Sequence, residues 1–214
     1  MISMETEKII SLLKKEYGNT FFLSKDHHYG AFYVLISCIL SQRTKDEVTY
    51  PAAKRLFKIA NNPKAMLALP IKTIEKAIYP AGFYITKAKR IKEVSKYLLD
   101  TFNGKVPDSY EELLKIKGVG RKTAGIVLTH AFKIPALPID THCHRIANRL
   151  GWVKTKTPEE TEKELTKILP KKDWIDMNEL LVKHGQQVCV PISPFCSKCV
   201  IREYCKRVGV ENNR

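Results

Sequence analysis

The stretch that decides the fold runs from Ser109 to His144 and reads SYEELLKIKGVGRKTAGIVLTHAFKIPALPIDTHCH. At its centre is a Gly-Val-Gly turn, because Gly118 and Gly120 can take positive φ without a Cβ penalty and so suit a tight connection. A capping box that starts at Ser109 predicts a helix before the turn. Apolar residues on one face predict a second helix over Arg121–Phe132. The stretch therefore predicts two helices joined by a glycine hairpin.

A hairpin of this kind can hold one phosphate group of a nucleic acid. The exposed N–H groups of the turn and of the following helix N-terminus would donate to the phosphate oxygens. A side chain at either glycine would block this close approach. Gly118, Gly120 and Arg121 are therefore expected to contact the nucleic-acid backbone.

Lys122 lies in the first turn of the helix that follows the hairpin. The positive end of the helix dipole and the adjacent Arg121 both disfavour a second cation, so Lys122 should lose its proton more easily than a free lysine. A neutral amine is a nucleophile that can form a Schiff base with the aldehyde carbon of a sugar. The more common role of a lysine beside a phosphate is only to neutralise charge, and position alone leaves both interpretations open.

The composition predicts a globular protein that binds a polyanion. Among 214 residues, 37 Lys and Arg stand against 22 Asp and Glu, which gives a formal net charge of +15. This charge favours binding to DNA or RNA and does not indicate which of the two is the partner. A chain of this length can form one large domain or two small ones, and no apolar run approaches the length of a membrane span. The N-terminal sequence MISMETEKIISLLKK has the pattern of an amphipathic helix rather than a signal peptide, so we expect a cytoplasmic protein.

Helical patterns recur along the rest of the chain. The predicted helices cover Glu5–Tyr17, Ala31–Leu40, Thr44–Ile59, Lys64–Leu69, Ile71–Ile78, Thr86–Phe102, Thr141–Leu150, Pro158–Ile168 and Trp174–Val188, and a loop is expected over Asn19–Gly30. Ala31–Leu40 is almost entirely apolar, which fits a buried strand as well as a buried helix, and a helix is favoured because the rest of the chain is helical. Thr44 opens a capping-box pattern, and Lys87 is expected on the outer face of its helix together with Lys89, Arg90 and Lys92.

Asp140 follows a short proline-rich link and directly precedes the helix predicted over Thr141–Leu150. It is therefore well placed to cap that helix with its carboxylate. A carboxylate that accepts backbone N–H bonds stays ionised, so a capping role is compatible with a second role as a negative charge in a reaction site.

Four of the six cysteines are grouped near the end of the chain, with the spacing C-x6-C-x2-C-x5-C. These are Cys189, Cys196, Cys199 and Cys205. Without a secretory segment, the grouping indicates metal ligation rather than disulfides. The close C-x2-C pair is typical of both zinc and iron–sulfur sites, and four thiolates by themselves fit either a tetrahedral zinc ion or a cubane cluster.

These motifs together resemble the endonuclease III family of DNA glycosylase/abasic-site lyases. The segment Leu114–Val127, with the core GVGRKTA, is similar to the family's helix-hairpin-helix, and Ile139–His142 is similar to its aspartate segment. The full cysteine spacing resembles the family's [4Fe–4S] loop. One departure is Lys117, where bacterial relatives usually carry proline. The resemblance covers about Ile9 to Arg207.

The resemblance implies an all-α, two-domain helix-hairpin-helix DNA glycosylase fold with a C-terminal [4Fe–4S] cluster loop. The first domain would be a six-helix domain over residues 24–132 that contains the hairpin. The second would be a discontinuous iron–sulfur domain of residues 1–23 plus 133–214. We expect a nucleoid-associated monomer that binds double-stranded DNA with a damaged base or an abasic site.

The resemblance also implies roles for the site residues. Lys122 would attack C1′ of a damaged nucleotide, and Asp140 would assist as a base or as an electrostatic partner of the sugar cation. The enzyme would then remove oxidised pyrimidines and cut the strand 3′ to the abasic site by β-elimination. Two alternatives stay open. A monofunctional mismatch glycosylase is the first, although such relatives generally lack this lysine. A non-catalytic helix-hairpin-helix DNA-binding module is the second, and it would need neither residue.

Two further segments are expected to meet DNA. The sequence LSQRTKDEV resembles a family segment in which a glutamine fills the gap left by a flipped base. The gap-free alignment sets Arg43 rather than Gln42 against that glutamine, so both remain candidates. The cysteine loop is expected to have a structural role and to present Lys198 and Arg202 to DNA phosphates.

Overall fold

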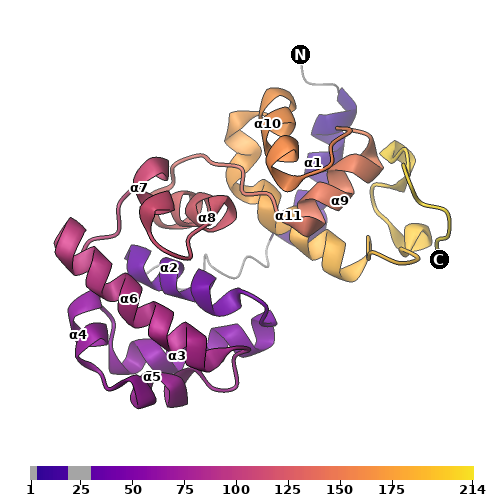
Figure 1. Ribbon diagram of the computed structural model, residues 1–214. Helices are drawn as coiled ribbons and strands as arrows, with labels where there is room; N and C mark the ends of the chain where they lie inside the picture. The colour runs from indigo at the N-terminus through magenta and orange to yellow at the C-terminus, as the bar shows by residue number, and fades with distance from the viewer. Residues whose placement is uncertain (1–3, 19–29) are drawn as a thin grey trace. The chain divides into compact units, whose positions relative to one another are not determined.

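A computed structural model of the protein describes residues 4–18 and 30–214 (Figure 1). These ranges contain α-helices and short 3-10 turns and no strand, which confirms the predicted all-α class. Apart from Gly30, the loop predicted over Asn19–Gly30 lies outside the described residues. In the part of the chain that is described, no helix is both long and apolar enough to cross a membrane. The chain divides into two compact units, one ending at Ile134 and the other joining the first helix with Pro135–Arg214.

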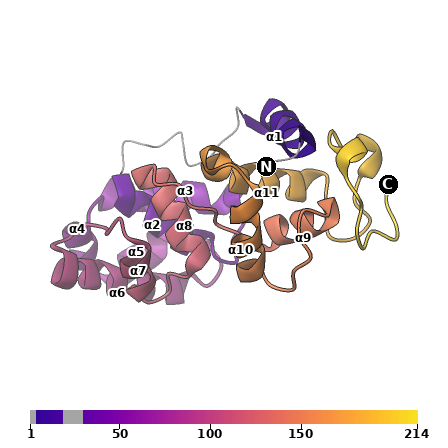
Figure 2. The same cartoon turned by 90° about the horizontal axis from the view of Figure 1, so that it is seen from above.

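The unit that ends at Ile134 is built around one buried helix. Its described elements are α2 (Gly30–Ser41), α3 (Asp46–Ile59), α4 (Pro63–Ala68), α5 (Ile71–Ile78), α6 (Tyr84–Phe102), α7 (Tyr110–Lys115) and α8 (Arg121–Phe132). Every residue of α2 from Phe32 to Leu40 is buried, and α3, α6 and α8 all pack against it (Figures 1 and 2). The helix predicted over this apolar run is therefore confirmed.

Helix α6 packs on α2, α4 and α5 along one long face. The buried residues of this face are Lys87, Ala88, Ile91, Val94, Ser95 and Leu98. The prediction of an outer position for Lys87 is wrong, because its side chain lies on the same face as Ile91 and only 6% of the residue is exposed. Lys89 is exposed, as predicted.

Capping side chains explain where three helices start, and the cap at Ser109 confirms the prediction there. The side chains of Asn62, Ser109 and Thr157 each accept a backbone N–H at the first turn of α4, α7 and α10 (Pro158–Ile168), respectively. The capping box predicted at Thr44 is wrong, because α3 begins at Asp46 and has no side-chain cap. The Thr44 hydroxyl instead accepts the N–H of Gly82 at 3.1 Å, so a partner distant in sequence takes the place of the local one.

The second unit has α11 (Trp174–Gln187) at its centre. Helices α1 (Met4–Tyr17) and α9 (Thr141–Leu150) both pack against α11, and α10 packs against α9. The described residues of Pro135–Arg214 also form the 3-10 turns η3 (Lys171–Asp173), η4 (Cys196–Lys198) and η5 (Arg202–Tyr204). Ile9 and Leu13 of α1 share a buried core with Leu180 of α11, so the first helix is held by residues from the far end of the chain.

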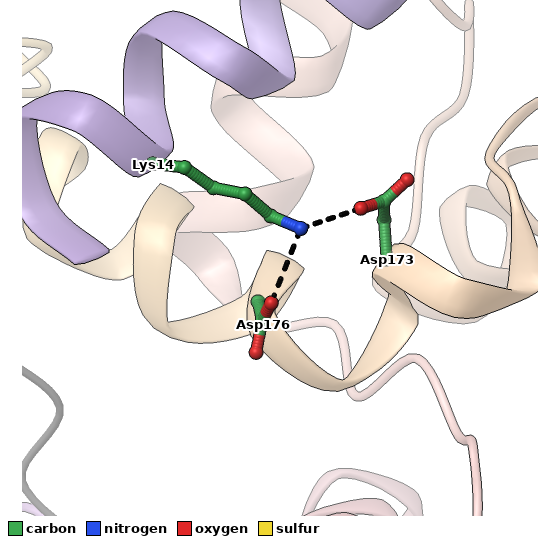
Figure 3. A network of polar contacts seen from close by, with 3 residues as sticks. All are labelled: Lys14, Asp173 and Asp176. Atoms are coloured by element: carbon green, nitrogen blue, oxygen red, sulfur yellow. Dashed lines mark hydrogen bonds and ion pairs between the residues drawn. The ribbon is translucent and has the colours of Figure 1, made fainter.

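An ion-pair network adds to this contact. The Lys14 ammonium lies 2.6 Å from a carboxylate oxygen of Asp173 and 3.3 Å from one of Asp176 (Figure 3). Burial works against the charged form of Lys14, but the two carboxylates together hold its pKa above the ordinary value of 10.5. The network therefore ties α1 to the start of α11.

Candidate active site and cysteine loop

The two hairpin glycines have different structural roles. Gly118 has a φ of +88°, and a Cβ there would lie 3.2 Å from the Arg90 side chain, so both backbone and space favour glycine. Gly120 caps α8 with a φ of −95°, so this residue does not use the positive φ that glycine can take. A Cβ on Gly120 would meet no described atom within 4 Å. Nothing in the described part of the protein therefore demands glycine at this second position.

Lys122 is exposed in the first turn of α8, directly after the hairpin. Burial raises the pKa of the Cys38 thiol in α2 to about 12, and the positive charge of Lys122 acts in the opposite direction. The ammonium therefore lies within electrostatic reach of α2. The neighbouring Arg121 places its guanidinium 5.1 Å from the ring centre of Tyr110, whose hydroxyl donates to the Arg121 carbonyl at 3.0 Å. These contacts join α7 to the start of α8.

The loop between α2 and α3 lies against the hairpin turn. The Gln42 amide donates to the carbonyl of Gly118 at 3.2 Å. Arg43 is exposed, has a φ of +53°, and places its guanidinium 5.8 Å from the ring centre of Phe83. One pocket is lined by Ile39, Gln42, Arg43, Phe83, Thr86, Lys87, Arg90 and Gly118. The structure thus brings the two candidate gap-filling residues and one hairpin glycine together.

Lys87 lies under this loop, and sequence reasoning missed its role. Its ammonium donates to the carbonyls of Leu40 and Gln42, both at 2.6 Å, and to the Thr44 hydroxyl at 2.7 Å. Burial lowers the pKa of Lys87 to about 8. The available signal was the spacing of four and seven residues from Lys87 to Ile91 and Val94, which puts the lysine on the apolar face of α6.

Asp140 caps α9, as predicted, and is half-buried in the unit that contains the cysteine loop. Its carboxylate accepts the backbone N–H groups of His142 and Cys143, both at 2.9 Å. Arg145 lies one turn further on and interacts electrostatically with Asp140. The Arg145 guanidinium also donates to the carbonyl of Cys189 at 2.8 Å, so α9 is fastened to the start of the cysteine loop.

All four predicted ligand cysteines line one cavity. Cys189 follows α11, Cys196 opens η4, Cys199 ends it and Cys205 ends η5. The cavity walls also include apolar side chains of Ile146, Leu150, Val188 and Ile201. The four thiols form no disulfide. Among the described residues, no group of three or more His, Cys, Asp or Glu side chains has the arrangement that holds a metal ion.

Three of these sulfurs lie beside a nitrogen. Arg149 donates to the Cys189 sulfur at 3.3 Å, and the backbone N–H of Arg207 donates to the Cys205 sulfur at 3.4 Å. His184 was missed from the sequence, and its Nε2 lies 3.6 Å from the Cys199 sulfur. Its spacing of three and seven residues from Leu181 and Met177 on α11 was the signal for a buried position.

Lys198 and Arg202 lie on the surface of the cysteine loop. Both are exposed, on η4 and η5 respectively. The Lys198 ammonium stands 5.9 Å from the ring centre of Phe195. Both charges therefore face solvent beside the cavity that the cysteines line.

Comparison with known proteins defines the class. Residues 36–171 match the HhH-GPD superfamily of base excision DNA repair proteins. Endonuclease III of Thermotoga maritima is 50% identical over 175 residues, which are 82% of each chain. A chloroplast endonuclease III homologue of Arabidopsis thaliana is 44% identical over 81% of this chain and 47% of the plant protein. A solved structure of a trapped covalent intermediate of endonuclease III with DNA is similar at a TM-score of 0.86, with 32% identity and 97% of each chain covered.

The chain belongs to the HhH-GPD superfamily of base excision DNA repair proteins and, within it, to the endonuclease III family. It is a DNA glycosylase and abasic-site lyase whose partner is DNA.

Proposed function

We propose that Lys122 is the nucleophile of this enzyme, that Asp140 assists it, and that the substrates are oxidised pyrimidines in double-stranded DNA. The observation that carries this proposal is the position of Lys122, which is exposed at the start of α8 directly after the hairpin turn. A phosphate bound by the N–H groups of the turn would bring a DNA strand against that helix N-terminus. Gly120 supports this arrangement, because the space around it leaves room for a DNA backbone.

The chemistry follows from an amine nucleophile. The damaged nucleotide leaves the base stack, and the electron pair of the neutral Lys122 amine attacks C1′. The bond from C1′ to the base breaks, and the base departs with its electron pair. The nitrogen loses one proton, and its electron pair then forms a C=N bond to C1′ as the C1′–O4′ bond breaks and O4′ takes up a proton. The resulting iminium acidifies the C2′ proton, and loss of that proton expels the 3′ phosphate by β-elimination. Water then hydrolyses the imine and releases the lysine.

Asp140 is suited to act as a negative charge near the sugar. The two N–H groups at the start of α9 hold its carboxylate in one orientation and favour the ionised form. A fixed carboxylate stabilises positive charge that develops on the sugar as the base leaves. It can also accept a proton during the reaction.

For the gap left by the extruded nucleotide, we favour Arg43 over Gln42. The Gln42 amide already donates to the Gly118 carbonyl, which joins the loop to the hairpin turn. Arg43 is exposed and has a long side chain with five N–H donors, which suits contacts with an unpaired base.

The four cysteines are proposed to hold a [4Fe–4S] cluster. The fit rests on four free thiols that line one cavity, and on nitrogen atoms beside three of the sulfurs. The Arg149 side chain and the Arg207 backbone N–H donate to two of these sulfurs, and such donors stabilise the negative charge of thiolate ligands. When bound, the cluster would stabilise the folded loop. The loop would then present Lys198 and Arg202 to DNA phosphates. Iron and sulfide analysis of protein purified without oxygen tests this, and zinc with no iron would contradict it.

Strand cleavage of a duplex that contains one oxidised pyrimidine tests the proposed function. Lys122→Ala should fold and lose cleavage. The matched control is Lys117→Ala, because Lys117 lies beside the same turn, is largely exposed and is 3.9 Å from Glu93. It should keep cleavage. Base release without strand cleavage by the wild type would instead indicate a monofunctional glycosylase, and cleavage by Lys122→Ala would overturn the assignment of the nucleophile.

A further inference from the structure

Lys87 has a complete set of hydrogen-bond partners within one short segment. An ammonium group has three N–H donors, and those of Lys87 reach the carbonyls of Leu40 and Gln42 and the hydroxyl of Thr44. All three acceptors belong to the end of α2 and the loop that leads to α3. None of them is a carboxylate. The buried charge is therefore balanced by oriented dipoles of this loop rather than by an ion pair.

The other charged groups around Lys87 do not offer such a pair either. Arg43 from the loop and Arg90 from α6 line the same pocket, and both are cations. The lowered pKa of Lys87, about 8, agrees with a site that is shielded from water. The loop carbonyls stabilise the buried ammonium of Lys87, and the ammonium in turn holds the loop in its conformation.

The same loop has a conformation that needs support. Arg43 adopts a φ of +53°, which is uncommon for a residue with a side chain. The N–H of Gly82 donates to the Thr44 hydroxyl at 3.1 Å. A Cβ on Gly82 would lie 2.8 Å from the Arg43 carbonyl oxygen, so the loop and the segment before α6 are in close contact. Lys87 is the charged group at the centre of this contact.

The loop is also linked to the catalytic hairpin. The Gln42 carbonyl accepts from Lys87 at 2.6 Å, and the Gln42 amide donates to Gly118 at 3.2 Å. Lys87, Gln42 and the hairpin turn therefore form a continuous chain of hydrogen bonds. A shift of the Gln42 backbone would change both the direction of Arg43 and the contact with the turn that precedes Lys122.

We propose that Lys87 is a positioning residue for the reaction on duplex DNA: its ammonium fixes the backbone of residues 40–44 so that Arg43 can enter the gap left by the extruded nucleotide. This inference rests on the proposed function. Lys87 does not touch the reacting atoms. Its removal leaves two carbonyls without a charged donor, and the loop then loses its single conformation. Reactions that need the loop should slow, and reactions that need only the Lys122 amine should not.

Single-turnover cleavage of one abasic oligonucleotide, as a duplex and as a single strand, separates reactions that need the loop from reactions that need only the Lys122 amine. A single strand has no opposite base and leaves no gap to fill. Lys87→Met should lose about tenfold or more in rate on the duplex and less than about threefold on the single strand, since small misplacements of positioning groups have effects of this size. The matched control is Lys89→Met, an exposed lysine on the same helix, which should retain both rates.

Thr44→Val provides a second variant should Lys87→Met not fold. It removes one of the three acceptors and keeps the shape of the side chain, so it should show a smaller loss in the same direction. Equal losses on both substrates, or no loss on the duplex, would overturn the proposal. If the wild type cleaves neither substrate, the proposed function itself has failed, which is a different outcome.

Discussion

Three lysines show how the surroundings of a side chain decide what it does. Lys122, the proposed nucleophile, is exposed at a helix start. Lys87 is buried against neutral acceptors, and Lys14 lies between two carboxylates. The pKa of Lys87 is lowered and that of Lys14 is raised, so the surroundings of the two ammonium groups act in opposite directions. Net charge alone distinguishes none of these roles.

The lowered pKa of Lys87 predicts a rise in stability at alkaline pH. The unfolded lysine keeps its proton to about pH 10.5, and the folded one loses it near pH 8. Below pH 8 the lysine is protonated in both the folded and the unfolded state, so folding carries the full free-energy cost of burying the charge. Between these values the unfolded state binds more protons, so the free energy of unfolding rises with pH, by on the order of 1–2 kcal/mol. Urea unfolding of the wild type and of Lys87→Met at several pH values measures this effect. The contributions of the other titratable groups cancel in the difference between the two free energies of unfolding. A difference that is constant with pH would contradict the prediction.

Substitution of Asp140 should separate its capping role from its proposed catalytic role. Asp140→Asn keeps an acceptor for the two backbone N–H groups and should cost only a few tenths of a kcal/mol, whereas Asp140→Ala should cost about 1 kcal/mol. Both variants lose the carboxylate, so both should lose most of the cleavage rate. Thermal unfolding and cleavage assays are made side by side. An Asn variant with wild-type activity would show that the charge is not used.

The residues that sequence reasoning found and those it missed differ in where their partners lie. The hairpin glycines, Lys122 and the cysteines belong to motifs that are local in sequence. The acceptors of Lys87 are 43 to 47 residues away, and the sulfur beside His184 is 15 residues away. Partners at such distances come together only through packing, which periodicity indicates but does not specify. The roles of Lys122 and Asp140 came from the family resemblance and remain predictions.

At the scale of the elements, local patterns were sufficient for most helices. The helices over Ile71–Ile78, Arg121–Phe132 and Thr141–Leu150 were predicted with the observed bounds. Asp140 caps the third of them, whereas the first two have apolar faces and no side-chain cap. The start of α3 was placed two residues early, since the Thr44 hydroxyl is engaged by Gly82 and Lys87 instead. A capping pattern predicts a helix start only where no stronger partner competes for the cap.

The attachment of α1 to α11 predicts the effect of losing Lys14. Asp173 is buried, so Lys14→Met would leave a buried carboxylate without its cation (Figure 3). We expect a loss of about 1–2 kcal/mol in the free energy of unfolding, reduced by the partial exposure of Lys14. The matched control is Lys15→Met, the exposed lysine next to it on α1, which should change stability little. Equal stability of the two variants in denaturant titrations would contradict the role of the network.

At the scale of the whole molecule, sequence distance hides the organisation of the fold. The core of one unit combines Ile9 and Leu13 with Leu180, which lies more than 160 residues away in the sequence. An amphipathic pattern shows that α1 has an apolar face, and it does not show which helices cover that face. Figures 1 and 2 show α1 beside α11 within this unit.

The net charge of +15 predicts binding to DNA that weakens steeply with salt. The proposed contacts of Lys198 and Arg202 should each contribute to this dependence. Replacement of either residue by alanine should reduce the slope of log affinity against log salt by about 0.9. Fluorescence anisotropy with a labelled abasic duplex measures the slope, and Lys163→Ala, an exposed lysine of α10, is the control. An unchanged slope in both variants would exclude the phosphate contacts.

The most direct test of the account is borohydride trapping with identification of the modified residue. Protein is mixed with a duplex that contains one abasic site, reduced, digested with protease and analysed by mass spectrometry. An amine nucleophile at Lys122 predicts a covalent adduct on this residue and its absence in Lys122→Ala. An adduct on another lysine would refute the assignment, and no adduct from a folded, DNA-binding wild type would contradict the Schiff-base mechanism.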